Sequence, residues 1–246
     1  MNILITGATG FIGKNLIEKL NNHYPDTTLF CCSSKTTNEE ILNYAEQSDF
    51  VFNLAAVHRP QNEDEFNKIN FEKFNLILNH LKQCKNPCPV LYTSSIQAGN
   101  NSPYGNSKVA AENSLIEHSK IMGSRGIIYR LTNTFGKWGR PNGHSVVATF
   151  CYNIQHNLPI IVNDANYIIN LSYVEDVVDS FLDRINETEF NDSEIYTLPN
   201  ELYYPISLGD LANLLYKFKE MDNDKQIFIP KNDFENKMYQ TFLSYA

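Results

Sequence analysis

The sequence predicts an α/β protein with a parallel sheet that helices cover on both faces, and three observations predict it. Strand-like and helix-like segments alternate through residue 132. Residues 50–56 form a continuous apolar run, typical of a strand buried on both faces. A glycine-rich turn over 6–13 joins the apolar run 3–5 to an amphipathic segment. This alternation implies right-handed crossovers and a doubly wound sheet.

The other elements of this region follow from the same patterns. Predicted strands cover 27–32, 90–93 and 127–131, and predicted helices cover 38–47, 63–84 and 103–122. Ser102 is typical of an N-cap, and Pro103 of the first helical position. A ligand of such a sheet lies beyond the carboxyl ends of its strands. We therefore expect the site where the loops at Gly7, Asn53, Ser94 and Thr132 converge.

Beyond residue 135 the alternation ends. A segment rich in glycine, basic and aromatic residues is followed by a helix through about 156 and short strands at 160–162 and 167–171. Further helices are expected from about 174, after Ser207 through 219, and over 234–245. The sequence therefore predicts a dinucleotide-binding domain over 1–135 and a small substrate-binding lobe over 136–246 that shares its core.

Composition excludes several classes of function. A net charge of −8 argues against binding to nucleic acid or to anionic membranes. No apolar run approaches the ~20 residues of a membrane helix, and the N-terminus is strand-like, so we expect a cytoplasmic protein. The five cysteines indicate reduced thiols, and the spacing of Cys84 and Cys88 does not fit a metal or redox pair, so no metal site is expected.

The spacing of the three glycines, G-x-x-G-x-x-G, predicts a dinucleotide cradle of the Rossmann type. Gly7 permits a positive φ, and Gly10 lets a pyrophosphate approach the backbone at the start of a helix. Gly13 lets that helix pack closely on the strand.

A tyrosine and a lysine four residues apart, Tyr104 and Lys108, share one face of the predicted helix over 103–122. A nearby cation favours phenolate and lowers a tyrosine pKa that is otherwise about 10. This pair follows a strand that ends in Thr93, Ser94 and Ser95. The combination indicates proton exchange with a hydroxyl or carbonyl group.

Together these motifs resemble the short-chain dehydrogenase/reductase superfamily, in its extended, nucleotide-sugar-processing branch (the NAD-dependent epimerase/dehydratase family). The matching pieces are TGATGFIG at 6–13, NLAA at 53–56, TSSIQ at 93–97, YGNSK at 104–108, RLTNTFG at 130–136 and YVEDVV at 173–178. The resemblance implies that Tyr104 is the general acid/base and that Lys108 holds the nicotinamide ribose. It assigns the substrate-polarising hydroxyl to Ser95, with Ser94 as the alternative.

The resemblance also implies the residues that contact the ligands. The expected cofactor contacts are Gly7, Thr9, Gly10, Phe11, Ile12, Gly13, Ser33, Ser34, Lys35, Leu54, Ala55, Ala56, Lys108 and Leu131. The expected substrate contacts are Ser94, Asn133, Lys137, Arg140, His144 and Arg59. The four basic residues are candidates because 168–171 lacks the arginine that this branch often uses for the diphosphate.

A narrower resemblance is to the reductase domain of CapF/WbjC-type enzymes, on residues 130–154, 162–164, 171–178, 214–219 and 234–246. It implies NADPH-dependent reduction of the C4 ketone of a UDP-2-acetamido-2,6-dideoxy-hexos-4-ulose. That step belongs to the synthesis of UDP-N-acetyl-L-fucosamine for capsule and O-antigen. The family's C-terminal cupin epimerase would begin where this chain stops, so the resemblance implies a cupin partner and leaves the cupin metal site outside these residues.

Cofactor choice depends on residues 31–36. NAD-specific sites place a carboxylate about 20 residues past the glycines, and none lies in this segment. Ser33, Ser34 and Lys35 can donate to a 2′-phosphate, so we predict NADP(H). The related enzymes carry an arginine near Ser34, which this chain lacks, and Lys35 as a plain surface charge is the alternative.

Three other activities compete with this interpretation. A dehydratase needs an acid after the catalytic hydroxyl, and Ile96 and Gln97 stand there instead. An NAD(P)-dependent nucleotide-sugar epimerase remains open. A non-catalytic NADPH-sensing regulator also remains, although such proteins commonly lose the Tyr/Lys pair. The predicted helices over 63–84 and 103–122 imply, by analogy with this branch, a homodimer.

Overall fold

The computed structural model describes residues 1–57, 62–143, 145–187 and 193–246. These residues form two compact units, Met1–Leu131 with Val178–Thr197, and Thr132–Val177 with Leu198–Ala246. The division therefore falls four residues before the boundary expected after residue 135. The chain also returns to the first unit over 178–197, a stretch expected in the second, because a strand in this stretch extends the first unit's sheet.

The described strands of the first unit form one parallel sheet in the order β2-β1-β3-β4-β5-β8. Their bounds are β1 Asn2–Thr6, β2 Thr28–Cys32, β3 Phe50–Asn53, β4 Val90–Ser95, β5 Gly126–Leu131 and β8 Ser193–Tyr196. The strand order reverses between β1 and β3, which makes this the switch point at which doubly wound sheets bind ligands. The predicted fold class is confirmed.

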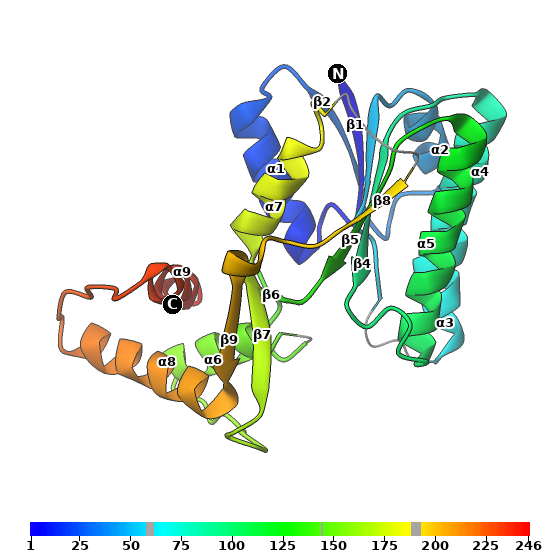
Figure 1. Cartoon of the computed structure of the whole chain (residues 1–246). Helices are drawn as coiled ribbons and strands as arrows, with labels where there is room; N and C mark the ends of the chain where they lie inside the picture. The colour runs from blue at the N-terminus through cyan, green and yellow to red at the C-terminus, as the bar shows by residue number, and fades with distance from the viewer. Residues whose placement is uncertain (58–61, 144, 188–192) are drawn as a thin grey trace. The chain divides into compact units, whose positions relative to one another are not determined.

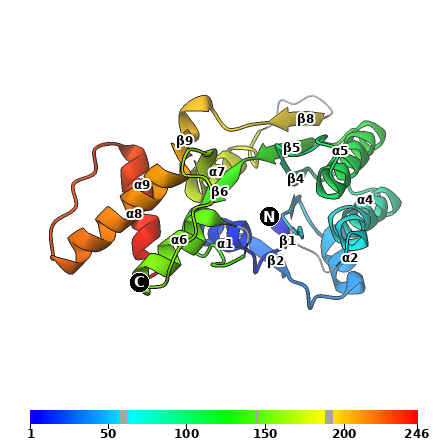
Figure 2. The same cartoon turned by 90° about the horizontal axis from the view of Figure 1, so that it is seen from below.

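Helices cover both faces of this sheet (Figures 1 and 2). On one face lie α1 (Phe11–His23) and the C-terminal half of α7 (Val174–Asp183), joined by an ion pair of 2.7 Å between Lys19 and Asp179. On the other face lie α2 (Asn38–Glu46), α4 (Lys73–Cys84) and α5 (Pro103–Met122). Strands β3 and β4 are buried along their whole length, as the apolar runs predict.

The helix expected over 63–84 is interrupted. It consists of α3 (Asp64–Asn67), a π-helical segment η1 (Lys68–Glu72) and α4. The fully buried Asn70 lies in η1, where its amide accepts from the Val57 N–H at 2.8 Å and donates to the Val57 carbonyl and the Ser107 hydroxyl. A π-turn inserts an extra residue into a helix, and here it aligns this amide with the loop after β3.

In the second unit, β6 (Asn133–Phe135), β7 (Ile168–Tyr173) and β9 (Tyr203–Ser207) form a separate sheet. It packs with α6 (Val146–Gln155), α8 (Leu208–Asn223) and α9 (Asp233–Leu243) around a core that includes Phe135, Phe150 and Phe218. The strand expected at 160–162 is wrong, because Ile161 is 80% exposed and the segment pairs with no described strand. The sequence did not predict β6, β8, β9 or the 3-10 turn η2 (Asn200–Leu202).

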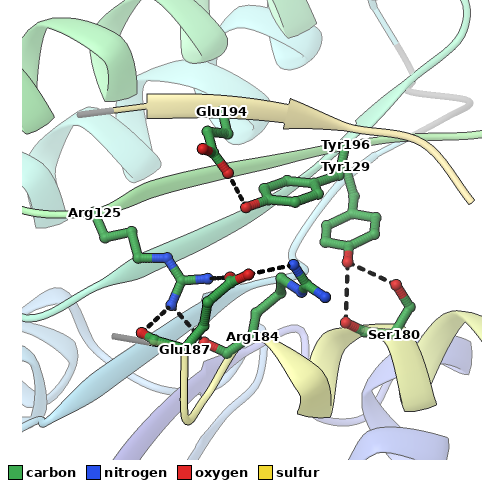
Figure 3. A network of polar contacts seen from close by, with 7 residues as sticks. All are labelled: Arg125, Tyr129, Ser180, Arg184, Glu187, Glu194 and Tyr196. Atoms are coloured by element: carbon green, nitrogen blue, oxygen red, sulfur yellow. Dashed lines mark hydrogen bonds and ion pairs between the residues drawn. The ribbon is translucent and has the colours of Figure 1, made fainter. Parts of the chain in front are cut away.

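A polar network holds β8 in the first unit (Figure 3). The buried Arg125 donates to the carbonyls of Arg184 and Glu187 and pairs with the Glu187 carboxylate. Beside it, Tyr129 of β5 stacks on Tyr196 of β8 and donates to the Ser180 carbonyl of α7. The network therefore ties the start of β5 to the segment that leads into β8.

The described residues contain no helix long and apolar enough to cross a membrane. They also contain no group of three or more His, Cys, Asp or Glu side chains placed to hold a metal ion. All five cysteines are free thiols.

Candidate active site

The loop after β1 has the backbone of a dinucleotide cradle. Gly7 has a φ of 69°, and a Cβ there would lie 2.8 Å from the backbone nitrogen of Ala55. A Cβ on Gly13 would lie 2.3 Å from the Gly7 carbonyl oxygen. Both positions therefore require glycine. Helix α1 begins at Phe11 with no side-chain cap from Gly10, so its first N–H groups are available to an anion.

The loops that face this cradle are held in place by β1 itself. The Thr6 hydroxyl donates to the Asn53 side chain at 2.7 Å and accepts from the Ala55 N–H at 3.2 Å. Leu54, Ala55 and Ala56 follow β3 and are half-buried, and Leu131 is buried at the end of β5. Thr9 and Gly10 are exposed, and Phe11 and Ile12 are half-buried.

The turn after β2 is folded by its own hydroxyl groups. The Ser33 N–H donates to the Thr36 hydroxyl at 3.0 Å, and the Lys35 N–H donates to the Ser33 hydroxyl at 3.2 Å. The side chains of Ser34 and Lys35 are exposed. The carboxylate of Glu40, in the first turn of α2, is bound by the backbone and hydroxyl of Thr37. Residues 31–36 thus contain no carboxylate, and the hydroxyls of Ser33 and Thr36 fold the turn by accepting its backbone N–H groups.

The structure brings together Ser95, Tyr104 and Lys108. Ser95 ends β4, and its hydroxyl is hydrogen-bonded to the side chain of Tyr104 on α5. Lys108 is 2% exposed, and its Nζ donates to the Thr93 carbonyl of β4 at 2.9 Å. The same Nζ lies 5.7 Å from the centroid of the Tyr104 ring. One helix turn and one strand end therefore present a hydroxyl, a phenol and an amine to each other.

Burial controls the protonation of this cluster. It lowers the pKa of Lys108 from 10.5 to about 7, against the opposing charge of Glu112. It raises the pKa of Tyr104 above its usual 10, against the hydrogen bond from Ser95. The depression expected for the Tyr104 pKa is not found, because desolvation of the phenol is the dominant effect.

The alternative hydroxyl, Ser94, points elsewhere. Successive side chains of a strand alternate between its two faces. The Ser94 hydroxyl donates to the carboxylate of Glu112, which is 3% exposed on α5. Arg130 of β5 donates to the same carboxylate from Nη2 at 2.6 Å and from Nε at 3.0 Å. Of the two serines, only Ser95 faces Tyr104.

The expected substrate residues of the second unit that the structure describes lie in β6 or in the loop that follows it. Asn133 and Arg140 are exposed, and Lys137 is half-buried with its Nζ 3.8 Å from the Glu175 carboxylate. Lys137 also lines a pocket of about 620 Å³ with residues of α9.

The Tyr245 hydroxyl donates to the carbonyls of Gly136 and Gly139 and so holds the loop that carries Lys137. Arg59 and His144 lie outside the described residues.

Sequence reasoning missed three polar residues that support this site. Asn70 orients the loop after β3, and the buried Glu112 pairs with the half-exposed Arg130 behind Ser94. Glu112 lies four residues after Lys108 on α5 and therefore on the same helix face as Tyr104 and Lys108. That spacing was visible in the sequence, but the partner on β5 was not.

A glycine cradle at the switch point of a parallel sheet, with a Tyr-x-x-x-Lys helix beside a serine strand end, defines a dinucleotide-binding protein of the extended short-chain type. Residues 3–198 match the model of the NAD dependent epimerase/dehydratase family, and the chain belongs to this family.

The chain is similar in particular to one group of longer proteins. It is 36% identical over 246 residues to a Pseudomonas aeruginosa protein named UDP-2-acetamido-2,6-beta-L-arabino-hexul-4-ose reductase, covering 100% of this chain and 65% of that one. Its structure is similar to that of the capsular polysaccharide assembling protein CapF from Staphylococcus aureus, with a TM-score of 0.88, 40% identity, and coverage of 100% of this chain and 66% of that chain. The expected resemblance to CapF-type proteins is confirmed.

A more distant structure shows the fold alone. The UDP-glucose 4-epimerase of Thermus thermophilus in complex with NAD has a TM-score of 0.78 at 17% identity, over 100% of this chain and 99% of that chain. This chain thus spans nearly all of the epimerase but slightly less than two-thirds of the two relatives above.

Proposed function

We propose that this chain reduces the C4 ketone of a UDP-2-acetamido-2,6-dideoxy-hexos-4-ulose with NADPH, in nucleotide-sugar synthesis for capsule or O-antigen. The observation that carries the proposal is the contact of Ser95 with Tyr104 beside the buried Lys108. The name of the Pseudomonas aeruginosa relative, a reductase of a UDP-linked hexul-4-ose, supports the choice of substrate.

The loop after β1 has the backbone that a dinucleotide cradle requires, because a Cβ at Gly7 would collide with the backbone of Leu54 and Ala55 and a Cβ at Gly13 with that of Gly7. We assign cofactor contacts to Gly7, Thr9, Gly10, Phe11, Ile12, Gly13, Leu54, Ala55, Ala56, Lys108 and Leu131. Ser33, Ser34 and Lys35 are assigned to the 2′-phosphate, because their turn presents donors and no carboxylate. A bound nicotinamide would supply the hydride, which the carbonyl carbon of the substrate would accept.

Tyr104 and Ser95 handle the carbonyl oxygen of the substrate. The raised pKa of Tyr104 keeps the phenol protonated, which is the form that a reduction requires. The Ser95 hydroxyl donates a hydrogen bond to the carbonyl oxygen and polarises it, and Tyr104 delivers its proton to the same oxygen. Lys108, as an ammonium, then stabilises the tyrosinate that is left.

Substrate recognition is assigned to Asn133, Lys137 and Arg140, and to Arg59 and His144 outside the described residues. A pyrophosphate carries negative charge, and guanidinium and ammonium groups are its usual partners. Ser94 is assigned an indirect part, because its hydroxyl is bound to Glu112. We further propose a cytoplasmic homodimer with a cupin epimerase as partner and with no role in nucleic-acid or membrane binding.

The test is NADPH oxidation with a small panel of UDP-4-keto sugars, with the product configuration read by NMR. Turnover should require the 4-ketone and should vanish in Tyr104→Phe, while NADPH binding to that variant stays close to wild type. NADH binding as tight as NADPH binding would remove the cofactor assignment. A UDP-sugar interconverted without net consumption of NADPH would show an epimerase instead. Full cellular function of Tyr104→Phe would show a sensor.

A further inference from the structure

We propose that Glu112, held by Arg130, is a positioning residue for the Ser95–Tyr104–Lys108 site. It ties α5 to β4 and supplies the negative charge that the buried Lys108 ammonium faces. This inference rests on the proposed function, because it gives Glu112 a part in that reaction without contact to the substrate.

The contacts of Glu112 join the three elements that build the site. Its Oε1 accepts from the Ser94 hydroxyl of β4 and from Arg130 Nε of β5 at 3.0 Å. Its Oε2 accepts from Arg130 Nη2 at 2.6 Å. Ser94 is the neighbour of Ser95 in the chain, and Glu112 is on the helix of Tyr104. A displacement of this carboxylate therefore changes the distance between Ser95 and Tyr104.

Burial makes this arrangement more than a surface ion pair. Glu112 is 3% exposed, Ser94 5% and Lys108 2%. Two buried charges of opposite sign, Glu112 and Lys108, thus lie one turn apart on α5, and Arg130 balances the carboxylate from its half-exposed position. Arg130 and Ser94 supply the donors that the buried Glu112 carboxylate needs.

Among the residues that the structure describes, the titratable side chains that face Lys108 are Tyr92 of β4 and Tyr104 and Glu112 of α5. Burial lowers the pKa of Lys108, and the charge of Glu112 opposes that effect. Loss of this charge therefore lowers the pH at which Lys108 loses its proton.

Glu112→Gln keeps the shape of the side chain and removes its charge. We expect kcat to fall on the order of tenfold with KM changed less than about threefold, because the substrate is not touched. The alkaline limb of the kcat profile should move to lower pH by about one unit. Glu117→Gln removes one charge from an exposed position of the same helix. It should leave kcat and the alkaline limb of its pH profile unchanged. The proposal is overturned if the alkaline limb of the kcat profile stays in place in Glu112→Gln, or if it shifts equally in Glu117→Gln.

Ser94→Ala separates geometry from charge, since it removes one contact of Glu112 and leaves its pair with Arg130. It should lower kcat several-fold without moving the alkaline limb. If the alkaline limb moves as far in Ser94→Ala as in Glu112→Gln, the charge of Glu112 is not the cause of the shift. Ser94→Ala also tests the geometry if Glu112→Gln does not fold. An unchanged kcat in Ser94→Ala would then overturn the positioning role of Glu112.

A readout without turnover keeps this inference distinct from the proposed function. The Lys108 signal of protein labelled with ¹³C at lysine Cε, assigned by its absence in Lys108→Met, is titrated by NMR. Its midpoint should be lower by about one pH unit in Glu112→Gln than in the wild type. Equal midpoints overturn the inference about Glu112. An inactive wild type with the expected shift would overturn the reaction and leave the electrostatic pairing intact.

Discussion

Replacement of Lys108 by methionine should abolish turnover and yet stabilise the fold near neutral pH. Lys108 carries an amine in a site that is 2% exposed, and burial lowers its pKa from 10.5 to about 7. Between these two values the unfolded chain binds the proton and the folded chain does not. Stability of the wild type therefore rises with pH through that window, and the cost of burying the amine is fully present below about pH 7.

The pKa shift sets the size of the effect. At about 1.4 kcal/mol per unit, the buried amine costs roughly 5 kcal/mol of folding free energy below pH 7. The substitution also removes the hydrogen bond to the Thr93 carbonyl, at about 1–3 kcal/mol, and the contacts with two tyrosine rings, at about 0.5–2 kcal/mol. Lys108→Met should thus be more stable than the wild type by roughly 2 kcal/mol at about pH 6.

The assay is urea unfolding of the cofactor-free protein, followed by circular dichroism from about pH 6 to about pH 9. The advantage of Lys108→Met should shrink by roughly 2–3 kcal/mol across this range, because the wild type loses its penalty as the pH rises. Lys120→Met, at an exposed position of the same helix, controls for the loss of a lysine from α5. A difference between Lys108→Met and wild type that stays constant with pH refutes the reasoning.

Three further predictions follow from named contacts. Gly13→Ala should weaken NADPH binding in a fluorescence titration and destabilise the fold by about 1–3 kcal/mol, since its Cβ would lie 2.3 Å from the Gly7 carbonyl; unchanged binding contradicts the cradle. Arg125→Met should cost about 2–4 kcal/mol in urea unfolding, because it removes the buried donor of the Arg184 and Glu187 carbonyls while Glu187 keeps its pair with Arg184, and a loss below about 1 kcal/mol contradicts the network of Figure 3. Arg140→Ala should weaken UDP-sugar binding more than NADPH binding by calorimetry, and equal UDP-sugar affinity removes Arg140 from the site.

Elements with strong local signals were predicted closely. The helix expected over 103–122 is α5, because Ser102 caps its N-terminus and Gly123, in the left-handed conformation, ends it. Both signals lie within a few residues of the element. The glycine cradle was predictable for the same reason, because the backbone conformation at Gly7 excludes other residues.

Elements that depend on distant partners were missed. β8 is short, and it is a strand because residues 193–196 pair with β5. The π-turn at Lys68–Glu72 exists because Asn70 reaches Val57 and Ser107, thirteen and thirty-seven residues away. No pattern within these segments encodes such contacts, so periodicity predicted one uninterrupted helix over 63–84.

The local sequence was enough for the parallel sheet, the cradle and the Tyr104–Lys108 pair, because turn chemistry and helical spacing act over a few residues. Tertiary structure was needed to distinguish Ser95 from Ser94, because only the packing of β4 and α5 decides which hydroxyl reaches Tyr104 and which reaches Glu112. It was also needed for the protonation of the site. The pKa values of Lys108 and Tyr104 are set by burial, and burial arises only when β4, β5 and α5 pack together.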